Sequence, residues 1–131
     1  MKIERQFIAY KKSIIHVSFF GTGNKLLICL HGYGEDGSSF ASLEKRLGDE
    51  YTLIAMDFPF HGNTGWNEGL LMTPNDLLNV LNAIIQQNEN VKDKSFKFSL
   101  IAFSLGGRVA LHMLQSIPAQ MERTVLLAPD G

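Results

Sequence analysis

A serine stands between a strand-like run and a helix-like run in the segment SLIAFSLGGRVALHML, residues 99–114. A nucleophile elbow forces its central residue into a strained turn between strand and helix, so the positions two residues away must be small. Ala102 and Gly106 meet this requirement around Ser104. The turn would expose the Ser104 hydroxyl at a helix N-terminus, where developing negative charge is stabilised. The simpler interpretation is an N-cap serine followed by glycines chosen for packing.

The loop HGYGEDG, residues 31–37, is the second candidate element. An oxyanion hole needs two backbone N–H groups, one from the residue after the nucleophile and one from the loop after an earlier central strand. Leu105 and Tyr33 are the candidates for these donors. His31 and Gly32 would shape the loop, and we expect the His31 imidazole itself to be a hydrogen-bonded structural group.

The same loop also matches a dinucleotide-binding fingerprint. The glycines of residues 32–37 follow a strand-like run and precede a helix-like run, and Asp57 ends the next strand-like run. A pyrophosphate would then lie on the following helix, and Asp57 would bind a ribose hydroxyl. Tyr33, Glu35 and Asp36 argue against this, because they bring bulk and negative charge to the phosphate position. Dinucleotide binding is kept as the lesser alternative, and we expect neither a cofactor nor a metal ion.

Strand-like runs alternate with helix-like runs along the chain. The predicted strands are residues 6–10, 14–20, 25–30, 51–58, 96–103 and 123–131, with a hairpin turn at 11–12. The predicted helices are a segment capped by Ser38 or Ser39 and ending at Gly48, residues 73–88 with a Thr cap and a Pro at the first position, and residues 105–116. This order predicts a mostly parallel sheet with helices on both faces, whose sites lie beyond the carboxyl ends of the strands.

The composition is that of an ordinary globular protein. The 131 residues are 45% hydrophobic and 19% charged, with a net charge of -1, which gives no electrostatic reason to expect nucleic acid as a partner. Cys29 is the only cysteine, which excludes a disulfide within the chain, and its apolar neighbours predict a buried, unreactive residue. No apolar run approaches the roughly 20 residues of a membrane span, so we expect no membrane partner and a cytoplasmic location.

Three segments taken together resemble the α/β-hydrolase fold family: LLICLHGYGEDGSSF, LIAMDFPFHGNT and LIAFSLGGRVAL. The resemblance runs in the family's order from about Ile14 to Asp130, with Phe60 and Ala102 where the family usually has glycine. It implies that residues 1–131 are the N-terminal portion of a single α/β-hydrolase domain, truncated after the strand that follows the elbow. It also implies small acyl substrates, such as esters or thioesters.

The base that would activate Ser104 is missing from the expected place. The family's order is serine, then acid, then a histidine far downstream. His16, His31 and His61 precede Ser104, and only His112 follows it. His112 lies eight positions along the same predicted helix, about 12 Å away and beyond hydrogen-bond reach. His61 could come near the site from the end of its own predicted strand and act as the base, whereas the resemblance implies a structural role for this position.

The acid is equally open. Asp130 follows the last predicted strand, which is an acid position in some members of the resembling family. Asp57 is expected to order its own turn by accepting hydrogen bonds from backbone amides. Trp66 either lines a pocket or anchors its loop.

Three hypotheses follow from these residues. The first is a serine hydrolase for a small ester or thioester, weak or inactive as this chain because the downstream histidine is absent. The second is a non-catalytic module that associates through the exposed edge of its last strand, with a second copy of the chain or with a complementing C-terminal segment. The third is a dinucleotide-binding domain.

Overall fold

The computed structural model describes residues 4–31, 37–59, 62–70, 72–88, 91, 97–103 and 121–127. Its strands are β1 (Glu4–Tyr10), β2 (Ser13–Phe20), β3 (Lys25–Leu30), β4 (Tyr51–Met56), β5 (Phe98–Phe103) and β6 (Met121–Leu127). Its helices are the 3₁₀ helix η1 (Gly37–Leu43), α1 (Glu44–Leu47) and α2 (Pro74–Gln87). The predicted helix over residues 105–116 lies outside the described residues.

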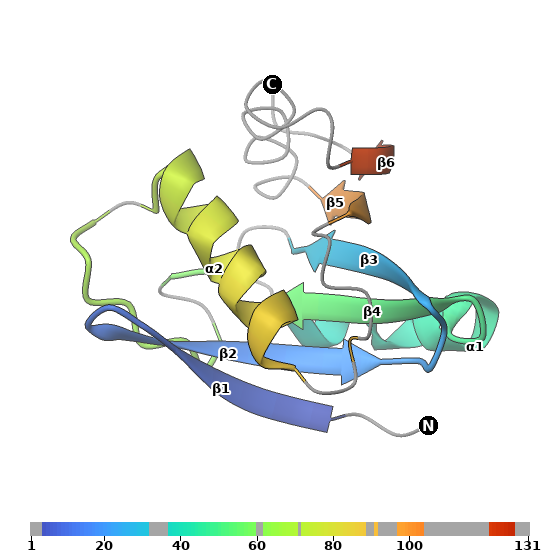
Figure 1. The fold of residues 1–131 in the computed structure, drawn as a ribbon, viewed down its shortest axis with the longest axis horizontal. Coiled ribbons are helices and arrows are strands. Elements are labelled where there is room, and N and C mark those ends of the chain that lie inside the picture. The colour runs from blue at the N-terminus through green and yellow to red at the C-terminus, as the bar shows by residue number, and fades with distance from the viewer. Residues whose placement is uncertain are drawn as a thin grey trace.

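The described strands form a six-stranded sheet in the order β1-β2-β4-β3-β5-β6 (Figure 1). β3, β4, β5 and β6 pair in parallel, whereas β1 pairs antiparallel with β2, and β2 pairs antiparallel with β4. The parallel part agrees with the alternating order of strands and helices in the sequence. The turn predicted between the first two strands is confirmed at Lys11 and Lys12, where Lys11 has a positive φ of 51°.

Glycines shape the connection from β2 to β3. A Cβ atom on Gly23 would lie 1.9 Å from the backbone carbon of Glu50, and Gly21 has a φ of +79°, which side chains rarely tolerate. The chain can therefore pass closely over the start of β4. This passage lets β3 lie beside β4 on the side away from β2.

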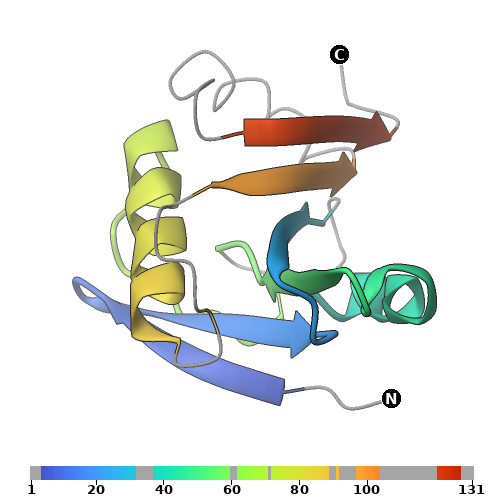
Figure 2. The same cartoon turned by 45° about the vertical axis from the view of Figure 1, so that its right-hand side comes forward.

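Two separate clusters of buried side chains lie on the two sides of the sheet. Alternation along β3 sends Ile28 and Leu30 into one cluster with Leu81 of α2, and Cys29 into the other with Phe40 of η1. Figure 2 shows α2 on one side of the sheet and the η1–α1 segment on the other. The sheet is thus an inner layer between helical segments.

The first predicted helix is only partly α-helical, which corrects the expectation of one α-helix ending at Gly48. Residues 37–43 form a 3₁₀ helix, and only Glu44–Leu47 are α-helical. Phe40 is buried and Leu43 packs against the same cluster. A 3₁₀ helix has three residues per turn, so it directs positions three apart to the same side, and this spacing suits both residues.

The second helix begins as predicted. Thr73 is the N-cap of α2, its hydroxyl accepts from the backbone N–H of Asp76, and the Asp76 carboxylate accepts from the backbone N–H of Thr73.

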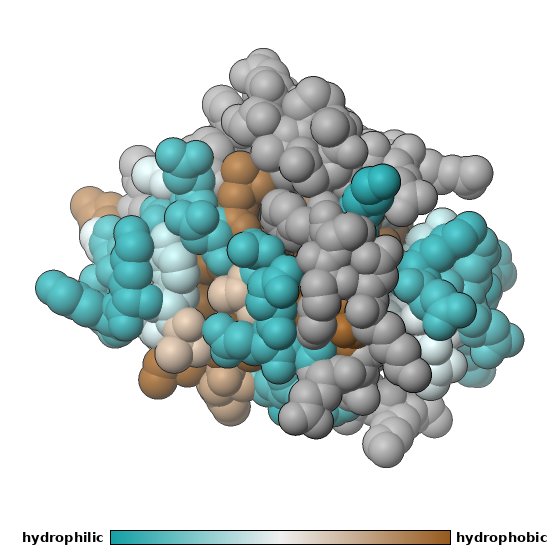
Figure 3. Space-filling view, viewed as in Figure 1, coloured by the Kyte–Doolittle hydropathy of each residue, from teal (hydrophilic) through white to brown (hydrophobic). Residues whose placement is uncertain are grey.

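No helix among the described residues is long and apolar enough to span a membrane. Hydrophilic side chains cover much of the outer side of α2, and hydrophobic ones show along the lower edge, where β1 runs (Figure 3).

Asp76 also joins α2 to the hairpin. The Tyr10 hydroxyl donates a 2.7 Å hydrogen bond to Asp76, and the Lys11 ammonium lies 3.8 Å from the same carboxylate. Partial burial raises the pKa of Asp76, but the hydrogen bonds from Tyr10 and Thr73 and the charge of Lys11 outweigh it, so the net pKa is below its ordinary value. Folding therefore favours the negatively charged form of the Asp76 carboxylate.

Asp76 is expected to make the stability depend on pH in the acidic range. Because its pKa is lower in the folded state, its contribution is complete above the unfolded pKa and is lost as the pH falls through the folded pKa. The check is urea unfolding of the wild type and Asp76→Asn from pH 7 down to pH 2. The free-energy gap between them should shrink as the pH falls, and a gap that is constant or grows would contradict this role.

Candidate functional site

The carboxyl ends of three adjacent parallel strands meet at one edge of the sheet. Leu30, the last residue of β3, is in register with Met56 of β4 on one side and with Ala102 of β5 on the other. The residues that follow these three positions, His31, Asp57 and Phe103, therefore share this edge. Ser104 comes next after Phe103 in the sequence and lies outside the described residues.

His31 is fully buried and hydrogen-bonded. Its Nε2 accepts from the backbone N–H of Phe58 at 2.9 Å, and its ring meets the Phe58 ring edge-on at a centroid distance of 4.7 Å. A nitrogen that accepts a hydrogen bond carries no proton, so the neutral ring has its proton on Nδ1. This geometry suits the structural role expected for His31 and links the end of β3 to the end of β4.

Asp57 is buried directly after β4, where it holds the following turn. Its Oδ2 accepts from the backbone N–H of Asn63 at 2.9 Å, and its carbonyl accepts from the Thr64 hydroxyl at 2.7 Å. These bonds agree with the expectation that Asp57 orders its own turn. They also argue against the dinucleotide alternative, because the carboxylate is already engaged inside the protein rather than presented to a ribose.

His16, a histidine that belongs to none of the sequence motifs, is the other partner of Asp57. Its Nδ1 lies 2.8 Å from Asp57 Oδ2, and both side chains are buried. A carboxylate accepts only, so Nδ1 is the donor. The signal available in the sequence was a histidine inside the mostly apolar run IIHVSFF, residues 14–20, in which Ser18 is the other polar residue. Its partner was not visible, because β2 pairs antiparallel with β4, which is far along the chain.

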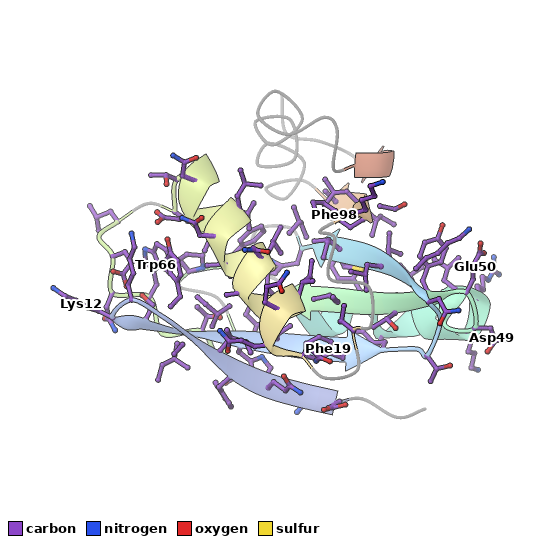
Figure 4. All side chains as sticks on the ribbon, in the orientation of Figure 1. Lys12, Phe19, Asp49, Glu50, Trp66 and Phe98 are labelled. Atoms are coloured by element: carbon purple, nitrogen blue, oxygen red, sulfur yellow. The ribbon has the colours of Figure 1, made fainter. Side chains whose placement is uncertain are left out.

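The loop after the Asp57 turn is fastened to the hairpin. Gly65 exchanges two backbone hydrogen bonds with Ile14, both 2.8 Å, and the buried Trp66 ring stacks on Tyr10 at a centroid distance of 6.1 Å. Figure 4 shows Trp66 at the hairpin end of the molecule beside Lys12, whereas Asp49 and Glu50 lie at the opposite end. These contacts favour the interpretation of Trp66 as a loop anchor.

Several predicted site residues lie outside the described part of the chain. They are Gly32, Tyr33, His61, Ser104, Leu105, Gly106 and Asp130. The nucleophile, the oxyanion donors and the acid therefore stay predictions.

Within the described residues, no group of three or more His, Cys, Asp or Glu side chains could hold a metal ion. Cys29 is free and buried, and burial strongly raises the pKa of its thiol, so it is not a nucleophile.

Comparisons with known proteins point to hydrolases. A family model described as serine aminopeptidase, S33, matches residues 22–130. An uncharacterized hydrolase, YugF, of Bacillus subtilis is 25% identical over 127 residues, which are 97% of this chain and 45% of that protein. A pimeloyl-[acyl-carrier protein] methyl ester esterase of Stenotrophomonas maltophilia is 33% identical over 104 residues, which are 79% of this chain and 36% of that protein.

Solved structures share the fold. The structure of a putative epoxide hydrolase from Pseudomonas aeruginosa superposes with a TM-score of 0.77 at 19% identity, over 95% of this chain and 40% of that chain. A thioesterase domain from the curacin biosynthetic pathway gives a TM-score of 0.77 at 20% identity, over 96% of this chain and 46% of that chain. The chain spans less than half the length of the two curated relatives named above and of both structures.

Replacing Asp57 by alanine should destabilise the fold by about 2–5 kcal/mol, because the buried His16 imidazole and the backbone N–H of Asn63 would lose their acceptor. The measurement is the free energy of unfolding in urea. Asp49→Ala is the matched control, since Asp49 is exposed, and it should change this free energy by less than about 0.5 kcal/mol. Equal losses in the two variants would contradict a special role for the Asp57 carboxylate.

Proposed function

Because the chain belongs to the serine aminopeptidase S33 family of α/β hydrolases, we propose that it is a serine hydrolase acting on a small ester or thioester. The observation that carries the proposal is the register at the centre of the sheet. Leu30 pairs with both Met56 and Ala102, so the loops beginning at His31, Asp57 and Ser104 leave the sheet from neighbouring strands at one edge. Sites in parallel sheets form at this edge.

In the proposed reaction, the Ser104 hydroxyl attacks the carbonyl carbon of the substrate and gives its proton to a base. The carbonyl oxygen becomes an oxyanion, which accepts hydrogen bonds from the backbone N–H groups of Leu105 and Tyr33. The alcohol or thiol then leaves, protonated by the same base, and an acyl-serine remains. Water hydrolyses the acyl-serine and restores the Ser104 hydroxyl.

Neither described histidine suits the role of base. His31 uses Nε2 to accept the Phe58 N–H. His16 donates from Nδ1 to Asp57 and sits on β2, three strand positions from β5 in the sheet, or about 14 Å at 4.8 Å per strand. We therefore assign the base to His61 or to a histidine beyond the 131 residues, with Asp130 as the candidate acid. Without a positioned base, the reaction should be slower by about 10³-fold or more.

The proposed substrate class rests on the chemistry of the similar proteins. The similar curated proteins include methyl ester esterases, and the similar structures include a thioesterase domain. Both hydrolyse an acyl group from oxygen or sulfur, which is the chemistry that an acyl-serine intermediate allows. The backbone oxyanion donors recognise only the carbonyl oxygen, so the acyl chain would be selected elsewhere.

The experiment is labelling of the 131-residue chain with a fluorophosphonate, read by intact mass. We expect slow addition of one probe, absent in Ser104→Ala and unchanged in Cys29→Ala, since the Cys29 thiol is buried. Labelling that persists in Ser104→Ala would refute Ser104 as the nucleophile. Complete absence of labelling would refute hydrolase activity of the 131-residue chain itself and favour a non-catalytic module, which would pair the outer edge of β6 with a second copy or a complementing C-terminal segment.

A further inference from the structure

The antiparallel ladder between β2 and β4 continues one residue past β4. Its last register pair is Val17 with Met56, and the backbone N–H of Asp57 then donates to the carbonyl of His16 at 2.9 Å. His16 and Asp57 are therefore directly opposite each other, and side chains of opposite residues lie on the same face. The ring of Phe7, on β1, lies 5.0 Å from the His16 ring between centroids. The two polar groups meet in a buried position.

His16 holds the Asp57 turn through both its side chain and its backbone. The imidazole donates to the Asp57 carboxylate, and the backbone N–H of His16 donates to the Thr64 hydroxyl at 2.9 Å. The same Thr64 hydroxyl donates to the Asp57 carbonyl at 2.7 Å. Three residues thus form a closed set of hydrogen bonds, which fixes the direction in which the chain leaves β4.

The next residue carries this constraint to β3. The direction of the Phe58 N–H is set by the peptide plane that it shares with Asp57. That N–H is the donor to His31 Nε2, and the Phe58 ring packs edge-on against the same imidazole. His31 is the first residue after β3, and β3 is the direct neighbour of β5, which ends at Phe103. A line of contacts therefore runs from His16 through Asp57 and Phe58 to His31.

We infer that His16 is a positioning residue for the site, acting through Asp57 and Phe58 on His31 at the start of the predicted oxyanion loop. The catalytic part of this inference rests on the proposed function, whereas the positioning part stands on the described contacts. Burial makes the effect specific, because a buried carboxylate that loses one donor must find another or shift its turn. Any such shift moves the Phe58 N–H away from His31 Nε2.

The test uses two variants of His16 in the full 131-residue chain. His16→Phe keeps an aromatic ring of similar shape but removes the donor, and His16→Asn restores an N–H near the position of Nδ1. Ser18→Ala is the matched control, since Ser18 is also buried on β2, two positions away. Thr64→Val is a milder variant that breaks the same set of bonds without touching the His16 ring, in case His16→Phe does not fold.

Two measurements are made on each variant. Measured by NMR, the hydrogen-exchange rate of the Phe58 amide should be about tenfold or more faster in His16→Phe than in the wild type. Thr64→Val should change this rate in the same direction. The exchange rates of amides within α2 should stay unchanged in both variants. In fluorophosphonate labelling, the maximal rate should fall about tenfold while the probe concentration for half-maximal rate stays within about twofold. His16→Asn should recover most of both effects, and Ser18→Ala should match the wild type.

The outcomes separate the two proposals. A wild-type chain without Ser104-dependent labelling would sink the proposed function, and the exchange arm would still decide the positioning role. Wild-type exchange of Phe58 in both His16→Phe and Thr64→Val would overturn the positioning role. The positioning role would also be overturned if His16→Asn failed to recover the exchange rate and the labelling rate. The same holds if the variants lost apparent probe affinity at an unchanged maximal rate. In either case His16 would act only through general packing.

Discussion

A buried carboxylate needs hydrogen-bond donors, and the arrangement of this protein around Asp57 follows from that need. Asp57 is the first residue after β4, and its Oδ2 accepts from the His16 imidazole and from the Asn63 backbone. One donor comes from a strand that precedes β4 by more than thirty residues, and the other comes from the turn that follows it. The Asp57 carboxylate therefore ties together β2, β4 and the loop that leaves β4.

The sheet order makes this one interaction matter for the rest of the edge. β4 lies between the antiparallel hairpin and the parallel strands β3, β5 and β6. The residues at the carboxyl end of β4 therefore contact both halves of the sheet. Asp57 faces the hairpin through His16, and Phe58 faces β3 through His31. The hydrophobic clusters stabilise the sheet as a whole, whereas these polar contacts set where its loops begin.

Local features were the ones that the sequence predicted well. The Lys11–Lys12 turn and the Thr73 cap followed by Pro74 depend on neighbouring residues, and the structure confirms both. The alternation of strands and helices also predicted the parallel half of the sheet. The 3₁₀ conformation of η1 was missed because the spacing of Phe40, Leu43 and Leu47 fits an α-helix as well.

Non-local features were not accessible in the same way. The position of β4 between β2 and β3 depends on tertiary packing, and the His16–Asp57 pair exists only in that antiparallel register. His16 therefore looked like one polar residue in an apolar strand. The predicted nucleophile, oxyanion donors and acid lie outside the described residues, so their support comes from the strand register and from the family.

Hydrogen bonds at the ends of β3 and β4 engage one ring nitrogen of each of the two described histidines, His16 and His31. The most direct measurement is NMR of the chain with ¹⁵N-labelled histidine at neutral pH, which distinguishes the two ring nitrogens. We expect His31 to be a neutral ring protonated on Nδ1, with its unprotonated Nε2 coupled to the Phe58 amide, and His16 to carry a proton on Nδ1. A proton on Nε2 of His31 would rule out the contact between β3 and β4 at this point, because that nitrogen could not accept the Phe58 N–H.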